Sequence, residues 1–128
     1  MKTAMQEHEL IMSLGSNSEQ EACFRRAVEL IGKEFHDVVY SRTIWTSPIG
    51  IESGDFMNAV VMAKTHRDEA ATIECLKSIE QKCGDSREKR GQNIVRMDID
   101  LLSFDGQKRH ENDWNRPYIA DLLHEIRK

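Results

Sequence analysis

Two aspartates, Asp98 and Asp100, lie two residues apart within the apolar segment MDIDLLSF at residues 97–104. Alternate residues of a strand share one face, and a rise of roughly 3.3 Å per residue places these side chains about 6–7 Å apart. Carboxylates at that separation repel each other unless cations neutralise them, and Mg²⁺ is a hard ion that prefers oxygen ligands and phosphate partners. The pair is therefore consistent with a magnesium site, and also with an ordinary charged surface on which Asp98 pairs with Arg96.

A basic segment precedes these aspartates in a chain that is acidic overall. The net charge is −4 at pH 7, yet residues 82–96 hold five Lys or Arg side chains against two acidic ones. The overall charge argues against general nucleic-acid binding, which needs a basic face. The local patch indicates either a small anionic ligand or a solvated loop.

Length and composition predict a single folded domain over residues 1–128. The chain is 39% hydrophobic and 31% charged, as is typical of globular proteins, and its length suffices for one core. No apolar run approaches the roughly 20 residues of a membrane helix, and the N-terminus lacks the apolar region of a signal peptide. The spacing of the three cysteines matches neither a zinc site nor a redox pair, so we expect reduced thiols and a cytoplasmic location.

Hydrophobic periodicity predicts the order β-α-β-β-α-β followed by a helical tail. Apolar and β-branched segments predict strands, which fall at residues 9–15, 36–46, 56–65 and 94–104. Apolar stripes at helical spacing predict one helix after Ser18, where Glu21 completes a capping box, and another from Arg67 to Gly84. Residues 116–128 indicate a short amphipathic helix.

This order predicts an α+β, ferredoxin-like fold: a four-stranded antiparallel sheet with two helices on one face, plus the C-terminal helical tail. The other face of the sheet is then open to solvent or ligand. In the last strand we expect Val95, Met97, Ile99 and Leu101 to face the helices, and Arg96, Asp98 and Asp100 to lie on the open face.

Six short motifs, taken in order, carry a resemblance to a known family. They are LGSN at residues 14–17, TSPIG at 46–50, DFMNAVV at 55–61, SIEQKCG at 78–84, MDIDLLSF at 97–104 and RPYIADLLHEI at 116–126. Together they resemble the 6-hydroxymethyl-7,8-dihydropterin pyrophosphokinases of folate biosynthesis, which transfer pyrophosphate from ATP to a pterin alcohol. The resemblance implies a Mg²⁺-dependent enzyme with ATP as co-substrate.

The resemblance also implies a pterin site. Phe56 and Tyr118 are similar to the family's pair of stacking aromatic residues, and a flat polar ring suits such a pair. Asn58 offers both a donor and an acceptor to the edge of the ring. The remaining edge would be bound by backbone groups of Thr46, Ser47, Pro48 and Ile49. Without the resemblance, Phe56 would be assigned to the strand core and Tyr118 to anchoring of the tail.

On the phosphate side, the resemblance implies that Asp98 and Asp100 hold two Mg²⁺ ions. The residues implied in nucleotide binding are Glu80, Arg87, Arg96 and Arg116. Of these, Arg87 and Arg96 are the expected catalytic residues, because a guanidinium fork matches the geometry of phosphate oxygens. Alignment and charge neutralisation carry most of a phosphoryl-type transfer.

The sequence departs from the family pattern on this same side. Asp85 stands where the family has an arginine, and an aspartate repels phosphates. An Asn-Ile-Val run replaces the family's Gly-Pro-Arg run, so Arg96 lies one residue later than the usual arginine, a shift that reverses faces in a strand. The link at residues 105–115 is shorter than usual, and Lys108 or His110 is the candidate replacement for its phosphate contacts.

Three hypotheses stay open. The chain is an active pyrophosphokinase in which Lys89, Arg90 or Arg96 compensates for the lost arginine, a non-catalytic pterin- or nucleotide-binding relative, or an interaction domain whose aspartates are surface charge. The aspartate pair favours the first, because a binding module has little reason to hold two repelling carboxylates together. Asp85 favours the second. The expected partners are small molecules rather than nucleic acid or membrane, and the oligomeric state is left open.

Overall fold

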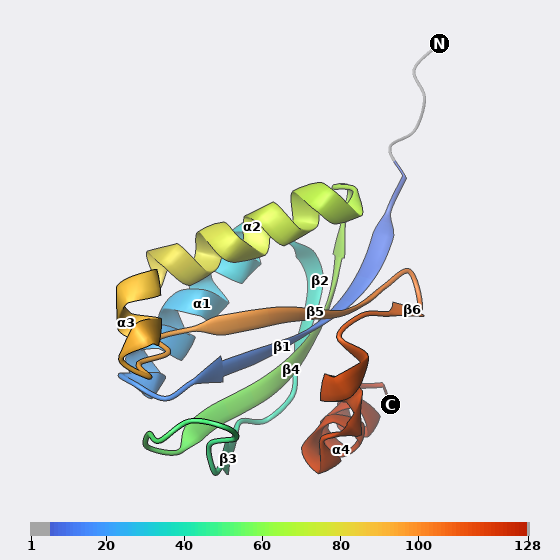
Figure 1. Ribbon diagram of the computed structural model, residues 1–128. Coiled ribbons are helices and arrows are strands. Elements are labelled where there is room, and N and C mark those ends of the chain that lie inside the picture. Colours follow the sequence, from blue (N-terminus) through green and yellow to red (C-terminus); the bar gives the residue numbers. More distant parts are fainter. Residues whose placement is uncertain (1–5, 128) are drawn as a thin grey trace.

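The computed structural model describes residues 6–127, which form a mixed α/β fold around one antiparallel sheet (Figure 1). The strands are β1 (His8–Ser16), β2 (His36–Tyr40), β3 (Ile44–Thr46), β4 (Phe56–Thr65), β5 (Asp98–Phe104) and β6 (Gln107–Lys108). The helices are α1 (Gln20–Glu34), α2 (Glu69–Lys82), α3 (Arg87–Gly91) and α4 (Pro117–Ile126), with a 3-10 turn, η1, at Glu111–Asn115.

The strand β1 lies in the middle of the sheet. The order is β2–β4–β1–β5–β6, and β3 also pairs with β4. Register places Gly15 of β1 opposite Asn58 of β4 on one side and opposite Asp98 of β5 on the other. The antiparallel pairing therefore brings residues far apart in the sequence to the same end of the sheet.

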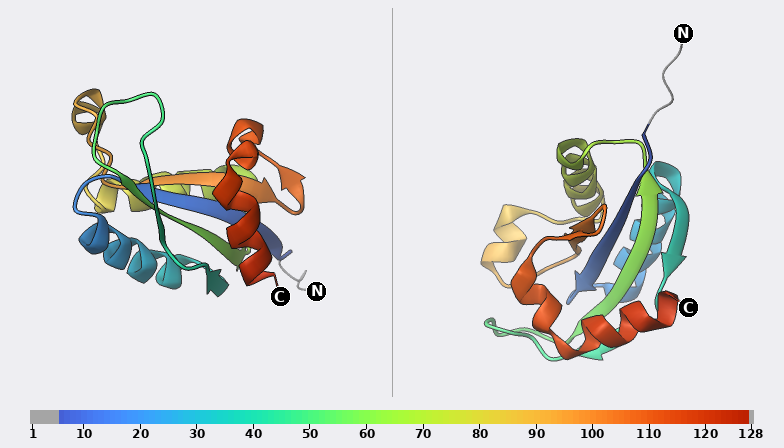
Figure 2. Two further views of the ribbon diagram at one scale, coloured as in Figure 1. Left: turned by 90° about the horizontal axis from the view of Figure 1, so that it is seen from below. Right: turned by 90° about the vertical axis from the view of Figure 1, so that its right-hand side faces the viewer.

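Helices α1 and α2 cover one face of the sheet (Figures 1 and 2). Phe24 and Ile31 of α1 and Leu76 of α2 are buried in one apolar cluster with the strands. Met97, Ile99 and Leu101 belong to the same cluster, as the alternating pattern predicts, but Val95, which precedes β5, lies outside it. Burial of each such side chain stabilises the fold by roughly 1.5–3 kcal/mol, so this cluster fixes which face of β5 points away from the helices.

Helix α4 packs on the opposite face, which was expected to be open (Figure 2). Its buried Ile119, Leu122 and Leu123 contact an apolar patch of the sheet that includes Val60 and Leu102. Apolar side chains on this face would be costly to leave in water, so the amphipathic tail covers them. The open-face prediction therefore holds only for the parts of the face beyond α4.

The predicted antiparallel sheet with two helices on one face is confirmed, but the count of four strands is wrong, because the described residues form six. The expected strand at residues 36–46 is interrupted at Ser41, whose Oγ accepts a hydrogen bond of 2.9 Å from the Val60 backbone N–H. In a regular ladder a backbone carbonyl would accept this hydrogen bond, whereas here the Ser41 side chain accepts it. The short β6 follows a tight turn at Asp105 and Gly106, both with positive φ.

The residues around α3 also differ from expectation. A solvated loop was one interpretation of the basic segment at residues 82–96, but within it Ser86 caps α3 by accepting a hydrogen bond from the Lys89 N–H at 3.1 Å. The strand predicted from residue 94 begins only at Asp98. At α1 the predicted capping box does not form, because the N-cap residue is Glu19, with φ 52 and no side-chain cap hydrogen bond.

Within residues 6–127 no helix has the length and apolar character needed to cross a membrane. The three cysteines, all described, are free. Cys23 and Cys83 lie together, each thiol donating to the other's backbone carbonyl, and burial raises the pKa of the Cys83 thiol to about 11. Residues 1–5, part of the segment expected to lack a signal peptide, lie outside the described range, as does residue 128 of the expected tail helix.

Candidate active site

A cavity of about 140 Å³ opens where β1 ends and where β4 and β5 begin. An apolar cavity of roughly 150 Å³ accommodates one benzene ring, so this one suits a small ring system. Most of the residues implied by the resemblance line it: Thr46, Ser47, Ile49, Phe56, Asn58, Asp98, Asp100, Arg116 and Tyr118. The structure thus brings the expected pterin-binding and metal-binding residues together.

Gly15 forms part of the wall, where β1 passes between its two partner strands. A Cβ at this position would lie 3.2 Å from Asn58 Oδ1 and 3.6 Å from Phe56 Cδ2. The first distance is tighter than most real contacts of a Cβ atom. The missing side chain of Gly15 therefore lets two of the expected pterin-binding residues lie close to the backbone of β1.

Asn58 is a buried polar side chain, 6% exposed, in the otherwise apolar strand β4. Its amide nitrogen donates to Thr46 Oγ1 at 2.6 Å and to the Phe56 carbonyl at 3.3 Å. The pairing of β3 with β4 supplies Thr46, so the short third strand orients the amide. With its nitrogen occupied in this way, Asn58 has Oδ1 left to accept a hydrogen bond from a ligand.

Asp98 and Asp100 both line the cavity, on the face of β5 that points away from α1 and α2. Burial raises the pKa of Asp100 to about 8, and the negative charge of Asp98 acts in the same direction. A divalent cation between the two carboxylates would relieve that repulsion, and their all-oxygen donor set fits Mg²⁺. The residues present therefore fit the ion that the resemblance implies.

Asp85, the conspicuous departure from the family pattern, holds an arginine at the site. Its Oδ1 accepts from Arg90 Nε at 2.6 Å, while Arg90 also donates to Asp98 Oδ1 at 3.2 Å and to the Met97 carbonyl at 3.1 Å. Arg90 lines the same cavity. Asp85 thus orients the Arg90 guanidinium toward Asp98 in the cavity, instead of leaving a bare negative charge there.

A second cavity, of about 330 Å³, adjoins the first and shares Arg90, Asp98 and Asp100 with it. Lys77, Glu80 and His110 also line it. Glu80 Oε2 accepts from the Ile99 N–H at 2.6 Å, where β6 does not extend to cover the edge of β5. Burial raises the pKa of Glu80 to about 7. Of the two suggested replacements, His110 reaches this cavity, whereas the Lys108 ammonium lies 4.8 Å from the centre of the Trp114 ring.

The chain matches a protein-family model, described as 7,8-dihydro-6-hydroxymethylpterin-pyrophosphokinase, over residues 11–128. The chain belongs to this family. The matched segment contains all the residues that line the two cavities. Membership therefore accounts for the order of the six motifs along the chain.

Two solved structures are also similar. A crystal structure of a Plasmodium falciparum HPPK-DHPS variant with pteroate matches at 15% identity, with a TM-score of 0.60, over 81% of this chain and 29% of that one. This chain therefore spans less than a third of that protein, and the likeness shows the fold. A de novo designed protein, Foldit4, matches at 11% identity over 77% of this chain and 98% of that one, but its TM-score of 0.40 is too low to indicate a shared fold.

Three residues expected at the site of this pyrophosphokinase-family chain do not line either cavity within the described residues: Pro48, Arg87 and Arg96. Arg96 precedes β5, so the alternation of the strand does not extend to it. It lies instead beside Gly84, whose added Cβ would be 3.6 Å from Arg96 Cγ. Arg87 is exposed as the first residue of α3.

Two charged residues near the site were not singled out by the pyrophosphokinase motifs, although Arg90 stood with Lys89 and Arg96 as a candidate to compensate for the lost arginine. Arg90 stood among several cations of the basic segment, and no spacing distinguished it from Lys89. Asp113 of η1 forms an ion pair of 3.3 Å with Arg116, whose other nitrogen donates to Tyr118 Oη at 3.3 Å. Asp113 lines neither cavity, but its negative charge helps to raise the pKa of Asp100. Because η1 returns to the sheet only through tertiary packing, no local pattern could have predicted this.

Proposed function

We propose that the chain is a Mg²⁺-dependent pyrophosphokinase that transfers pyrophosphate from ATP to 6-hydroxymethyl-7,8-dihydropterin in folate biosynthesis. Family membership supports this reaction. The main observation in support of the proposed reaction is that one cavity is lined by the Asp98/Asp100 pair and by Asn58, Phe56 and Tyr118. We further propose that the chain acts as a single domain in the cytoplasm, where its free cysteines stay reduced.

On the pterin side, Phe56 and Tyr118 would contact the faces of the ring, and Asn58 Oδ1 would accept from its edge. An amide held by Thr46 and by the Phe56 carbonyl loses little rotamer freedom when a ligand binds. A ring that donates to Oδ1 is favoured over one that covers it without a donor, because an acceptor buried unpaired by the ligand costs about 1–3 kcal/mol. This side of the cavity would therefore select the substrate.

On the nucleotide side, Arg90, Arg116, Lys77 and His110 supply the cationic and donor groups nearest the two aspartates. We propose that Arg90 takes the role of the arginine that Asp85 replaces. In the proposed reaction the pterin hydroxyl oxygen bonds to the β-phosphorus of ATP, the bond from that phosphorus to the α-phosphate oxygen breaks, and AMP leaves. Two Mg²⁺ ions held by Asp98 and Asp100 would supply charge neutralisation on the phosphate oxygens.

A specific observation favours a second candidate, a non-catalytic pterin- or nucleotide-binding relative. The Arg90 guanidinium donates to Asp98 Oδ1 at 3.2 Å, so a metal ion at Asp98 must compete with an internal cation. If that ion pair persists in the presence of MgATP, metal binding and turnover are lost while the pterin side stays intact.

The direct test is an assay of AMP formation from MgATP and 6-hydroxymethyl-7,8-dihydropterin. The proposed enzyme forms AMP in step with loss of the pterin alcohol, and chelation of Mg²⁺ stops it. Absence of AMP together with micromolar pterin binding by calorimetry would support the non-catalytic relative. Absence of binding to either ligand would leave only the interaction domain. Arg25→Lys, an exposed substitution on α1, should form AMP at the rate of the unaltered chain and serves as the control for substituted chains.

A further inference from the structure

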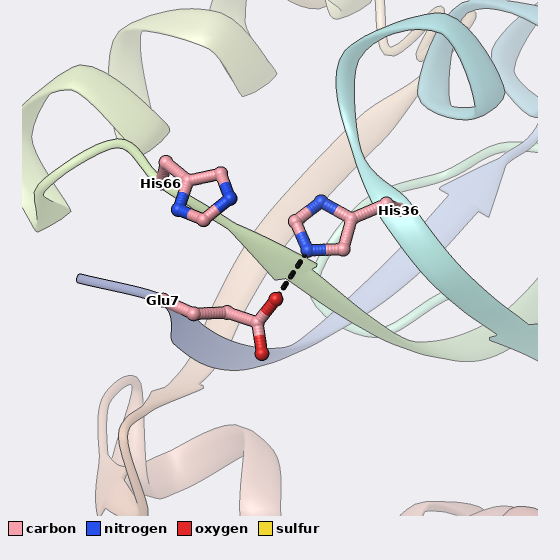
Figure 3. Close-up of side chains that lie close together, drawn as sticks. All are labelled: Glu7, His36 and His66. Atoms are coloured by element: carbon pink, nitrogen blue, oxygen red, sulfur yellow. Dashed lines mark hydrogen bonds and ion pairs between the residues drawn. The ribbon is translucent and has the colours of Figure 1, made fainter. Parts of the chain in front are cut away.

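Three side chains with metal-binding atoms converge at the end of the sheet opposite the candidate active site (Figure 3). Glu7, His36 and His66 each offer one ligand atom, and these atoms all lie within 4.8 Å of one another. Glu7 precedes β1, His36 begins β2 and His66 follows β4, so the strand order β2–β4–β1 gathers them. Gly15 lies eight positions after Glu7 along β1, roughly 26 Å at about 3.3 Å per residue.

Hydrogen bonds already orient two of these side chains. Glu7 Oε2 accepts from His36 Nε2 at 2.7 Å, the dashed contact in Figure 3. His66 Nδ1 lies 3.3 Å from the Gln6 carbonyl oxygen, which can only accept, so Nδ1 carries the hydrogen. The other ring nitrogen of a neutral His66 then keeps its lone pair. A hydrogen bond from one ring nitrogen to a backbone carbonyl commonly orients a histidine whose other ring nitrogen binds a metal.

The charges around this cluster favour a cation. Lys64 Nζ lies 3.8 Å from Glu7 Oε1 and 3.7 Å from Asp37 Oδ2, so one ammonium is shared between two carboxylates. With both histidines neutral, Glu7 and Asp37 carry two negative charges against the single positive charge of Lys64. A divalent ion would balance this excess.

We propose that Glu7, His36 and His66 bind one divalent transition-metal ion of the Zn²⁺ class, with water as the fourth ligand. Two imidazoles and one carboxylate suit Zn²⁺, whereas Mg²⁺ prefers oxygen alone. Bonds of roughly 2.0–2.1 Å in a tetrahedron place ligand atoms about 3.4 Å apart. The His36 and His66 rings are stacked with their centroids 5.2 Å apart, so closure requires the rings to turn and the hydrogen bond between His36 and Glu7 to open. The side chains of Glu7 and His36 are 44% and 41% exposed, which leaves them room for this rearrangement.

The bound ion would connect the start of β1, the start of β2 and the end of β4. In the unfolded chain these residues lie far apart, so the ion binds the folded state preferentially and stabilises it. The site is separate from the Asp98/Asp100 pair, and its occupancy should leave Mg²⁺-dependent activity unchanged. If the zinc site is disproved, the proposed enzymatic function is therefore not weakened.

Calorimetry with Zn²⁺ on the metal-stripped full chain, in buffer containing millimolar Mg²⁺, tests the site. We expect one Zn²⁺ per chain with micromolar affinity, and a melting temperature several degrees higher with zinc. The double variant His36→Ala, His66→Ala should weaken binding by at least about 100-fold and lose the zinc-dependent shift in melting temperature. His124→Ala removes an exposed histidine on α4 and should behave as the unchanged chain does.

Co²⁺ then identifies the ligand atoms, because the free cysteines are the alternative zinc ligands. We expect visible absorption bands of a tetrahedral nitrogen and oxygen site, without the near-ultraviolet bands that thiolate ligands produce. Thiolate bands, equal zinc affinity in the double variant, or no zinc binding by the unaltered chain would each overturn the proposal. Because the substituted histidines lie at the surface, circular dichroism should show the double variant folded.

Discussion

Gly15 shows how much the candidate site depends on single residues. It sits opposite both Asn58 and Asp98 in the sheet, and its missing Cβ leaves room for Asn58 Oδ1 and the Phe56 ring. A methyl group here meets a side chain that is held by its own hydrogen bonds, so the amide cannot simply rotate away. The geometry of the pterin side therefore depends on a residue that has no side chain.

Gly15→Ala should weaken binding of 6-hydroxymethyl-7,8-dihydropterin by about tenfold, which corresponds to about 1.4 kcal/mol, with the fold retained. Isothermal calorimetry measures this loss. The matched control is Gly32→Ala on α1, where no atom lies within 4 Å of an added Cβ. That change should leave pterin binding unaltered and stabilise the helix by about 0.5–1 kcal/mol. Equal pterin affinity in both variants would contradict the role of Gly15.

Asp100 gives the metal-free protein a pH-dependent stability. Burial raises its pKa to about 8 in the folded state, above an ordinary value of 3.8, so the folded state binds the proton more tightly. Stability from this group is thus present at low pH and is lost as pH rises from about 4 to 8. Glu80, with a pKa raised to about 7 by burial, acts in the same direction.

Asp100→Asn should therefore stabilise the metal-free protein at pH 8 by about 1–2 kcal/mol, and much less at pH 5. Urea unfolding at the two pH values, with chelator present, measures the difference. Asp121→Asn, an exposed change on α4, should show no such dependence. A wild-type protein that is equally stable at both pH values would show that Asp100 titrates normally.

At the scale of elements, Arg90 links α3 to the start of β5, in addition to the cap that Ser86 provides at the helix N-terminus. Arg90, near the end of this five-residue helix, donates to Asp85, to the Met97 carbonyl and to Asp98 at the start of β5. An isolated helix of this length does not persist in water. The planar fork of Arg90 therefore fixes both the helix and the cationic group beside the aspartates.

Arg90→Lys should cost roughly 1–3 kcal/mol of stability, because a single ammonium cannot make the three contacts of the guanidinium. If Arg90 contacts phosphates as proposed, the KM for MgATP should rise about tenfold or more, while pterin affinity stays close to wild type. Steady-state kinetics and pterin calorimetry separate the two effects. Arg25→Lys on α1 is the control. Unchanged KM in Arg90→Lys would remove Arg90 from the nucleotide site.

The elements that the sequence predicted well are those whose patterns are local. The strand at residues 56–65 agrees with β4 at both ends, since residues 57–65 pair with β1 without interruption and Phe56 pairs with Thr46 of β3. The strand at 36–46 was split because Ser41 bonds to Val60, a contact between segments that no periodicity reports. Arg96 was placed on the wrong face for a similar reason: β5 begins two residues after it, and tertiary packing sets that boundary.

The site was predictable to the extent that its residues lie within motifs. Asp98 and Asp100 stand out as acids in an apolar strand, and Asn58 as an amide in another. Arg90 and Asp113 reach the site only through the fold, by the short helix α3 and the return of η1 toward the sheet. Glu80 was expected near the nucleotide from the resemblance, and its bond to the free edge of β5 supplies a structural reason for its position.

For the whole molecule, the antiparallel sheet presents two distinct ends. Near residue 15, β1, β4 and β5 meet around the cavity with the paired aspartates, and near residue 7, β1, β2 and β4 meet around the histidine cluster. Helix α4 covers the part of the outer face between these ends and, through Tyr118, contributes to the cavity. Catalysis and transition-metal binding are therefore expected to be independent of each other.

The most direct test of the central claim is the rate of Mg²⁺-dependent AMP formation by Asp98→Ala and Asp100→Ala beside the unaltered chain. We predict turnover by the unaltered chain and a loss of at least about 10²–10³-fold in each variant, with pterin binding in the absence of metal barely weakened. No AMP from the unaltered chain, or turnover that survives both substitutions, would contradict the assignment of the aspartate pair to magnesium and catalysis.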